Sequence, residues 1–414
     1  MHLPKLRRLP ELDALRGLFL VWMILVHLPT HISNFADQPF GFVSAAEGFV
    51  FLSAVLVGRI YYREHMLDQK GVRRHLWRRS FRIYAYHIAL LAFAFSILAV
   101  YAVHTHRAAL TNLLNFYLNH PGPAIVGSVF LIYCPPLFDI LPLYVTFLFL
   151  SPLILSAATR FRWRTVVGFS LLLWLGAQFG LRDAFHNLIV HLTHLHIPLQ
   201  ETGSFNMFAW QAVWVTGLWM GSASAHGDVP LARTPRWAIP LSAAICVFFA
   251  IVRYGWFGPH LDWPALGLLV DKWQLGPLRV VNLVAFAIFF FWLRKWVVLL
   301  ISREPFLTMG KASLQVFCAH LFFVFIGLAL LYGDMEQLGW PTAILLIAVT
   351  FLALFWVAAR EVRKRRQAKE ARIAAATQAV AAPPGPPPQE PTLRAALSAN
   401  ITEESRLAEA HRSS

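Results

Sequence analysis

Apolar runs of about twenty residues recur along the whole chain, separated by short polar or basic segments. A helix needs about 20 apolar residues to cross the roughly 30 Å hydrocarbon core of a bilayer. We therefore predict ten spanning helices, over residues 12–28, 42–61, 83–103, 140–158, 166–181, 206–225, 238–255, 279–293, 313–331 and 341–359. A membrane β-barrel would instead show segments of about ten residues that alternate between apolar and polar positions. The pattern predicts an all-α, polytopic membrane bundle.

Composition agrees with this fold class. Of the 414 residues, 57% are hydrophobic and only 14% are charged, whereas a soluble domain carries about 25% charged residues. The three cysteines, Cys134, Cys246 and Cys318, show no C-x-x-C spacing. Neither a disulfide framework nor a zinc site is therefore indicated.

The placement of positive charge gives the bundle a direction. The net charge is +15, and nearly all lysines and arginines fall before the first predicted span, in every second loop and after the last span. The opposite loops hold only Arg107, Arg182 and Lys272, with Arg253 near a span end. Cytoplasmic loops are enriched in Lys and Arg, so both termini are predicted to be cytoplasmic. This charge faces a lipid bilayer, and no nucleic-acid partner is indicated.

The non-cytoplasmic side is rich in histidine, and the segment HNLIVHLTHLH places His191 and His194 at helical spacing. Its only acidic companions are Asp183 and Glu201, so hydrogen-bonding surface imidazoles are favoured over a metal site. On the same side, residues 122–138 are apolar but short and end in prolines, which predicts a re-entrant or interfacial piece.

The domain organisation follows from a change in composition. Residues 1–362 form the predicted membrane domain, and residues 363–414 form a tail rich in Pro, Ala and Glu. Such a tail cannot bury a core and is predicted to be a disordered cytoplasmic extension. A short helix around TLRAALSAN is an alternative for part of it, and no function is assigned to the tail.

The first predicted span carries three polar side chains, Asp13, Arg16 and His27. Arg16 and His27 are eleven residues apart, which places them on one helix face about 16 Å apart along the axis. Polar groups inside a membrane usually face a cavity or a partner. His27 is a candidate general base; the alternative is a histidine at headgroup level just before Pro29.

Glu47 lies near the outer start of the second predicted span, at the level of His27. A contact between them would orient the imidazole and favour its cationic form. The alternative is a structural carboxylate buried against an arginine or backbone donors. His320, in the middle of the ninth predicted span, is a further buried histidine that needs a hydrogen bond or a function.

A basic cluster that includes Arg78, Arg79 and Arg82 enters the third predicted span from the cytoplasmic side. Such clusters commonly bind anionic lipid, and arginine also binds phosphate with two parallel hydrogen bonds. With Arg16 at the same level, a site for a phosphorylated cytoplasmic donor is the second interpretation. The chain has no G-x-S-x-G, P-loop, G-x-G-x-x-G or H-E-x-x-H motif.

The runs ELDALRGLFLVWMILVHLP and QPFGFVSAAEGFVFLSA resemble the signature of the OpgC family. Looser similarities are DILPLYVTFLFLSP, FNMFAWQAVWVTG and GKASLQVFCAH, so that the resemblance covers roughly residues 10–360. Members of this family are bacterial inner-membrane proteins that succinylate periplasmic glucans. The wider relatives, acyltransferase family 3, share an Arg and a His at the spacing of Arg16 and His27. One departure is Ala54, where the family commonly has Gly.

The resemblance implies an O-acyltransferase that uses cytoplasmic acyl-CoA, with succinyl-CoA expected, as a co-substrate without a tightly bound cofactor or metal. It implies that Arg16, Arg79 and Arg82 hold the phosphates of the donor and that His27 acts at the acceptor hydroxyl. Glu47 is expected to assist His27, and Asp13 and His320 are expected to contact substrate. A succinyl group also needs a cation for its distal carboxylate, which the sequence alone does not identify. The alternatives are an exporter of a glycan or acyl metabolite and a non-catalytic scaffold.

Overall fold

The computed structural model describes residues 9–256, 264–302, 304–332 and 336–381. These residues form helices and loops without any β-strand, apart from one isolated bridge between Thr30 and Leu338. The chain divides into two compact units, residues 1–362 and 363–414.

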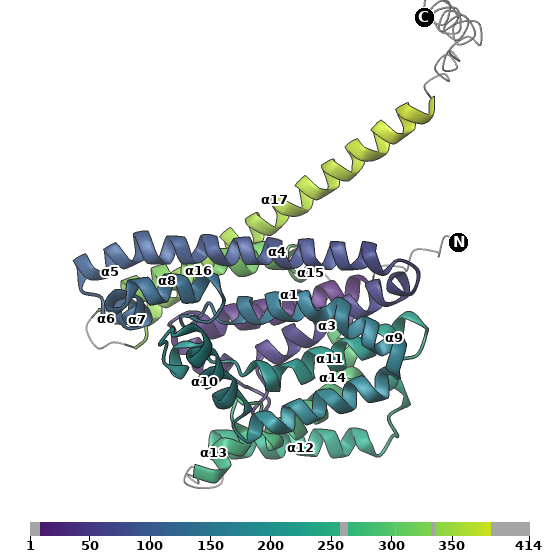
Figure 1. The fold of residues 1–414 in the computed structure, drawn as a ribbon, viewed down its shortest axis with the longest axis horizontal. Coiled ribbons are helices and arrows are strands. Elements are labelled where there is room, and N and C mark those ends of the chain that lie inside the picture. The colour runs from purple at the N-terminus through teal and green to yellow at the C-terminus, as the bar shows by residue number, and fades with distance from the viewer. Residues whose placement is uncertain (1–8, 257–263, 303, 333–335, 382–414) are drawn as a thin grey trace, which may run out of the picture. The chain divides into compact units, whose positions relative to one another are not determined.

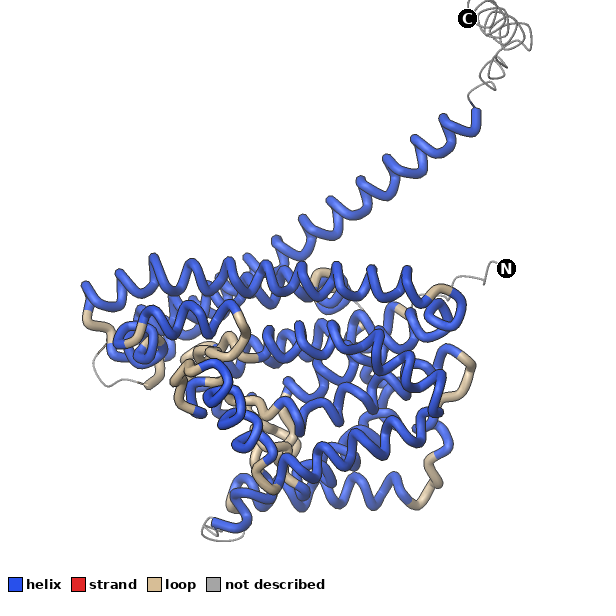
Figure 2. The backbone as a smooth tube through the Cα atoms, viewed as in Figure 1, coloured by secondary structure: helices blue, strands red, loops and turns tan. Residues whose placement is uncertain are grey.

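The longer helices of the first unit form an all-helical bundle (Figures 1 and 2). They are α1 (Pro10–His27), α3 (Ala45–Leu67), α4 (Gln69–Phe93), α9 (Ile140–Gln178), α11 (Met207–Ala225), α12 (Ala238–Tyr254), α14 (Pro277–Ile301), α16 (Ser313–Leu330) and α17 (Trp340–Ala381, which continues into the second unit). A π-helical turn, Ala94–Leu98, joins α4 to α5 (Ala99–Thr105).

Shorter helices occupy the connections. They are α2 (His31–Ala36), α6 (Ala108–Leu113), α7 (Asn115–Asn119), α8 (Pro121–Val129), α10 (Leu181–Thr193), α13 (Pro264–Val270) and α15 (Phe306–Lys311), with 3₁₀ turns at Leu199–Glu201 and Pro230–Arg233. The predicted non-spanning piece, 122–138, contains α8 followed by turns and a loop.

Every predicted span falls on a helix, and the described residues include six helical segments that are long and apolar enough to cross a membrane. These are Ala45–Leu67, Gln69–Thr105, Ile140–Gln178, Pro277–Ile301, Ser313–Leu330 and Trp340–Ala375, and the apolar helix Ala238–Tyr254 is shorter. The protein is therefore a membrane protein. The number of ten crossings and the cytoplasmic termini stay predictions.

Two expectations need correction. The loop predicted between spans 140–158 and 166–181 is reduced to a break within α9, where Arg162 leaves helical geometry with a φ of 66° and a ψ of 153°. The tail is helical as far as Ala381, and an Arg366–Glu370 pair one turn apart accompanies its Ala-rich sequence, a combination that favours helix. The Pro-rich stretch and TLRAALSAN lie outside the described residues.

The helix pair α3 and α11 packs through small residues. Gly217 and Gly221 of α11 form a G-x-x-x-G motif against α3, and a Cβ added at Gly221 would lie 2.1 Å from the carbonyl oxygen of Val55. Gly58 of α3 packs equally closely against α11, since a Cβ added there would lie 2.2 Å from the carbonyl oxygen of Leu218. Small residues let backbones approach in this way where no hydrophobic effect drives helices together within a membrane.

We expect Gly221→Ala to destabilise the bundle by about 1–3 kcal/mol, the usual cost of overpacking, because the added methyl group meets backbone that cannot move aside. Thermal unfolding of the purified protein in detergent measures this. Gly168→Ala is the matched control, since that glycine is also helical but has open space at its Cβ position. Equal melting temperatures for the two variants would contradict the close packing of α3 on α11.

Candidate active site

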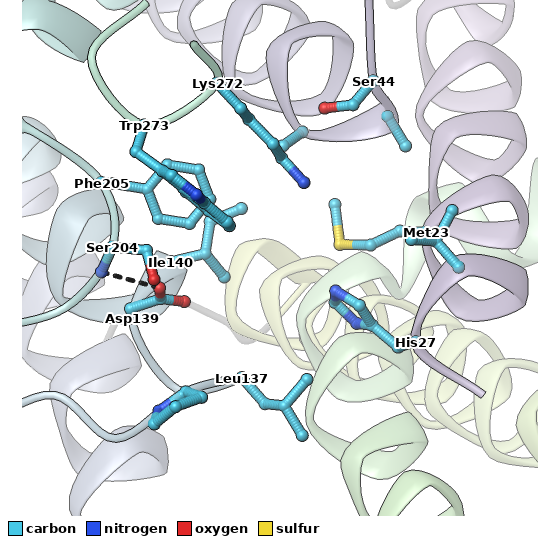
Figure 3. A pocket seen from close by; sticks show the side chains of 14 residues that line it. Met23, His27, Ser44, Leu137, Asp139, Ile140, Ser204, Phe205, Lys272 and Trp273 are labelled. Atoms are coloured by element: carbon cyan, nitrogen blue, oxygen red, sulfur yellow. Dashed lines mark hydrogen bonds between the residues drawn. The ribbon is translucent and has the colours of Figure 1, made fainter. Parts of the chain in front are cut away.

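A cavity of about 250 Å³ lies where the ends of several helices meet (Figure 3). Its walls come from the end of α1, the start of α3, the segment before α9, the segment before α11 and the loop after α13. The lining residues are Met23, Val26, His27, Ser44, Ala45, Ala46, Pro136, Leu137, Asp139, Ile140, Ser204, Phe205, Lys272 and Trp273. In the predicted topology, all five segments belong to the non-cytoplasmic side.

His27 is paired with His320 of α16. Nδ1 of His27 lies 3.0 Å from Nε2 of His320, and the two ring planes are 18° apart with centroids 5.3 Å apart. The other nitrogen of His320, Nδ1, hydrogen-bonds to the carbonyl oxygen of Phe317. His320 is fully buried. The structure thus brings together two of the predicted site residues.

These contacts determine where the protons lie when both rings are neutral. A carbonyl oxygen only accepts, so Nδ1 of His320 must donate to Phe317, and Nε2 of His320 is left as an acceptor. Nδ1 of His27 must then donate to His320, which leaves a lone pair on Nε2 of His27. That nitrogen has no hydrogen-bond partner among the described residues, and its ring lines the cavity. The arrangement suits a general base.

Glu47 does not pair with His27. Its carboxylate contacts the guanidinium of Arg279, with Nε 2.6 Å and Nη2 2.5 Å from Oε1, and both side chains are at most 1% exposed. The other oxygen, Oε2, accepts hydrogen bonds from the backbone N–H and the hydroxyl of Ser44, closing a capping box at the start of α3. The expected pairing is therefore wrong, and the alternative of a structural carboxylate describes Glu47.

Arg16 and Arg79 lie near one another, outside the wall of the cavity. Nη2 of Arg16 donates to the hydroxyl of Ser313 at 2.5 Å, and Nη2 of Arg79 donates to the hydroxyl of Tyr144 at 3.2 Å. Arg16 also lies within electrostatic range of Tyr144. Because Tyr144 is only one helical turn from Ile140 in the cavity wall, α9 connects the arginines to the cavity.

Arg82 and Asp13 lie outside the cavity wall. Arg82 is exposed on α4. Asp13 is 3% exposed and lies where α1 crosses α15, with its carbonyl oxygen against Gly310. It does not line the cavity, and its contact with substrate stays a prediction. Within the described ranges, no group of three or more His, Cys, Asp and Glu side chains could hold a metal ion.

A family model described as "OpgC protein" matches residues 8–368. The chain belongs to the OpgC family. The matched region contains all the residues that line the cavity, the histidine pair, and Arg16, Arg79 and Arg279. No curated protein and no solved structure matches the chain.

Three residues of this OpgC family member gain importance only from the structure: Arg279, Lys272 and Asp139. Arg279 and Lys272 lie more than 200 residues after Glu47 and His27 in the sequence. Helical spacing therefore cannot predict that these residues meet. Asp139 lies across the cavity, where its Oδ2 accepts from the backbone N–H of Ser204 at 3.1 Å. Burial raises the pKa of the Asp139 carboxyl, and its hydrogen bonds to Ser204 and the charge of Lys272 counteract that rise. The one sequence signal for Lys272 is that lysine and arginine are scarce in the predicted non-cytoplasmic loops, and Lys272 is one of the few.

We expect Arg279→Leu to destabilise the protein by about 3–5 kcal/mol, because removing one partner leaves a buried, uncompensated charge on Glu47. The double variant Glu47→Leu/Arg279→Leu should recover much of this loss, since neither charge then remains. Thermal unfolding and the yield of monodisperse protein in detergent report both effects. A double variant no more stable than Arg279→Leu would argue against a structural ion pair.

Proposed function

We propose that this OpgC family member is a membrane-bound O-acyltransferase of the bacterial inner membrane. It transfers an acyl group, succinyl, from cytoplasmic acyl-CoA to hydroxyl groups of periplasmic glucans. The observation that carries the proposal is the free Nε2 of His27 at the cavity, backed by the hydrogen-bonded chain through His320 to the carbonyl of Phe317. Family membership supports a glucan-modifying transferase.

The proposed reaction is a direct acyl transfer. The oxygen of the acceptor hydroxyl attacks the carbonyl carbon of the thioester, and its proton passes to Nε2 of His27. The carbon–sulfur bond then breaks, and the proton held by His27 goes to the departing thiolate of CoA. The products are the glucan ester and CoA–SH. His320 acts as a positioning residue, because its bond to Nδ1 holds the imidazole of His27 and stabilises the imidazolium formed during transfer.

The arginines suit the donor end of the same reaction. Arg79 is partly buried and donates a hydrogen bond to a neutral hydroxyl, so a phosphate of CoA would supply the negative charge that a desolvated guanidinium favours. Arg16 lies beside it and also bonds to a hydroxyl, that of Ser313. Arg82, exposed on the same helix, is proposed as an outer contact for the donor.

His27→Ala should lower kcat by about 10²–10⁴-fold, the range that a general base supplies, while the protein stays folded. His320→Ala should lower kcat by less and leave the KM for acyl-CoA unchanged, because it acts only through His27. Release of CoA by purified protein, with glucan present, measures both and separates a transferase from an exporter. His191→Ala is the control, since His191 is exposed on α10. Normal CoA release by His27→Ala would refute the role of His27.

Arg79→Ala should raise the KM for acyl-CoA about tenfold or more, as expected from the loss of one charge-assisted contact of about 1.5–3 kcal/mol. Arg78→Ala is the matched control, because Arg78 is the neighbouring residue on α4 but is exposed. The same CoA-release assay, run over a series of donor concentrations, gives both KM values. Equal increases for the two variants would mean that only the general positive charge of this surface matters.

A further inference from the structure

The proposed reaction leaves a cation of the cavity wall, the ammonium of Lys272, without a role. Its side chain extends into the cavity from the loop after α13 (Figure 3). Nζ lies 4.8 Å from the centre of the Trp273 ring. None of the ion pairs within the described parts of the chain includes Lys272. The ammonium therefore lies against an aromatic face.

The carboxylate on the opposite wall does not neutralise Lys272 by contact. Asp139 is hydrogen-bonded to the backbone of Ser204; it lies within electrostatic range of Lys272 but forms no ion pair with it. A partly buried ammonium without a carboxylate in contact is costly, and an anion brought by a ligand relieves that cost. The cavity thus presents a cation and a general base, His27, on separate walls of one small space.

The loop that carries Lys272 is held firmly by hydrogen bonds to its backbone. Donors from α9, α11 and the residue before α11 bind four successive carbonyl oxygens, from Lys272 to Leu275. The bonds run from Nε1 of Trp210 to Lys272 and to Trp273 at 3.2 Å, from N–H of Asn206 to Trp273 at 3.0 Å, from Nε2 of Gln178 to Gln274 at 2.9 Å and from Nε1 of Trp174 to Leu275 at 2.9 Å. A fixed backbone gives a flexible lysine a defined origin, which recognition of a specific group requires.

We propose that Lys272 binds the distal carboxylate of the acyl group and so selects dicarboxylic acyl donors of succinyl length over neutral ones. The inference rests on the proposed acyl transfer. With its carboxylate at Lys272, the acyl chain crosses the cavity and presents its thioester carbonyl on the side of His27. The volume of about 250 Å³ is below the roughly 300–1,000 Å³ of pockets for drug-sized ligands, which suits a short acyl chain and one sugar hydroxyl.

The test compares succinyl-CoA with butyryl-CoA, which has the same four-carbon chain but a methyl group in place of the carboxylate. An unsubstituted, neutral glucan serves as acceptor, so that the donor is the only source of a carboxylate. Lys272→Met should lower kcat/KM for succinyl-CoA roughly 30-fold or more, as loss of a buried charge partner does, and should leave butyryl transfer unchanged or faster. Lys272→Arg should keep most of the succinyl transfer. Lys70→Met, an exposed lysine at the start of α4, is the control.

The outcomes separate this inference from the proposed function. If the wild-type protein transfers acyl groups but Lys272→Met keeps its preference for succinyl-CoA, the role of Lys272 is refuted and the transferase stands. Equal losses for both donors would also refute it, because they indicate a structural role. If the wild-type protein releases no CoA with any donor, the proposed function fails and the inference fails with it.

Discussion

The buried ion pair between Glu47 and Arg279 is the contact on which the geometry of the cavity depends. One oxygen of Glu47 binds the guanidinium, and the other fixes Ser44 in the cavity wall. The same guanidinium donates to the side-chain oxygen of Gln38 at 3.2 Å and to the carbonyl oxygen of Val270 at 3.4 Å, two residues before Lys272. The starts of α3 and α14 and the end of α13 are therefore joined at one point. Such a pair adds little net stability, but it specifies which helix ends meet.

The two ends of the proposed reaction have different chemical environments. His27 and Lys272 line the cavity, whereas Arg16 and Arg79 lie outside its wall and are bonded to hydroxyl groups. The hydroxyl of Tyr144 carries no charge, so its bond to Arg79 leaves the positive potential of that guanidinium in place for an anionic donor. Arg16 and His27 are about 16 Å apart along the axis of α1. An acyl donor bound at the arginines has to bridge this distance to reach His27.

The local sequence pattern predicted the all-helical fold class and the helical state of each predicted span, because the length of an apolar run is a property of consecutive residues. It also predicted that Arg16 and His27 share a face and that His320 needs a partner. It failed for Glu47, whose partner Arg279 was counted as part of a span and not as a site residue. A carboxylate in an apolar helix shows that a partner exists, but its identity depends on tertiary packing between residues 232 positions apart. Lys272 is unpredictable for the same reason. The composition of the tail shows that it cannot bury a core, but this does not exclude a helix in its Ala-rich part.

The separation of Glu47 and Arg279 along the chain also has a consequence for biosynthesis. A ribosome adds about 5–20 residues per second, so Glu47 is made roughly 10–50 s before Arg279. During that interval α3, the second predicted span, has to enter the bilayer with an acidic side chain whose partner Arg279 has not yet been synthesised. The Ser44 capping box lies within the same helix start and forms as soon as α3 does. It satisfies one oxygen of Glu47 early and so lets the first half of the bundle insert before the second half has been translated.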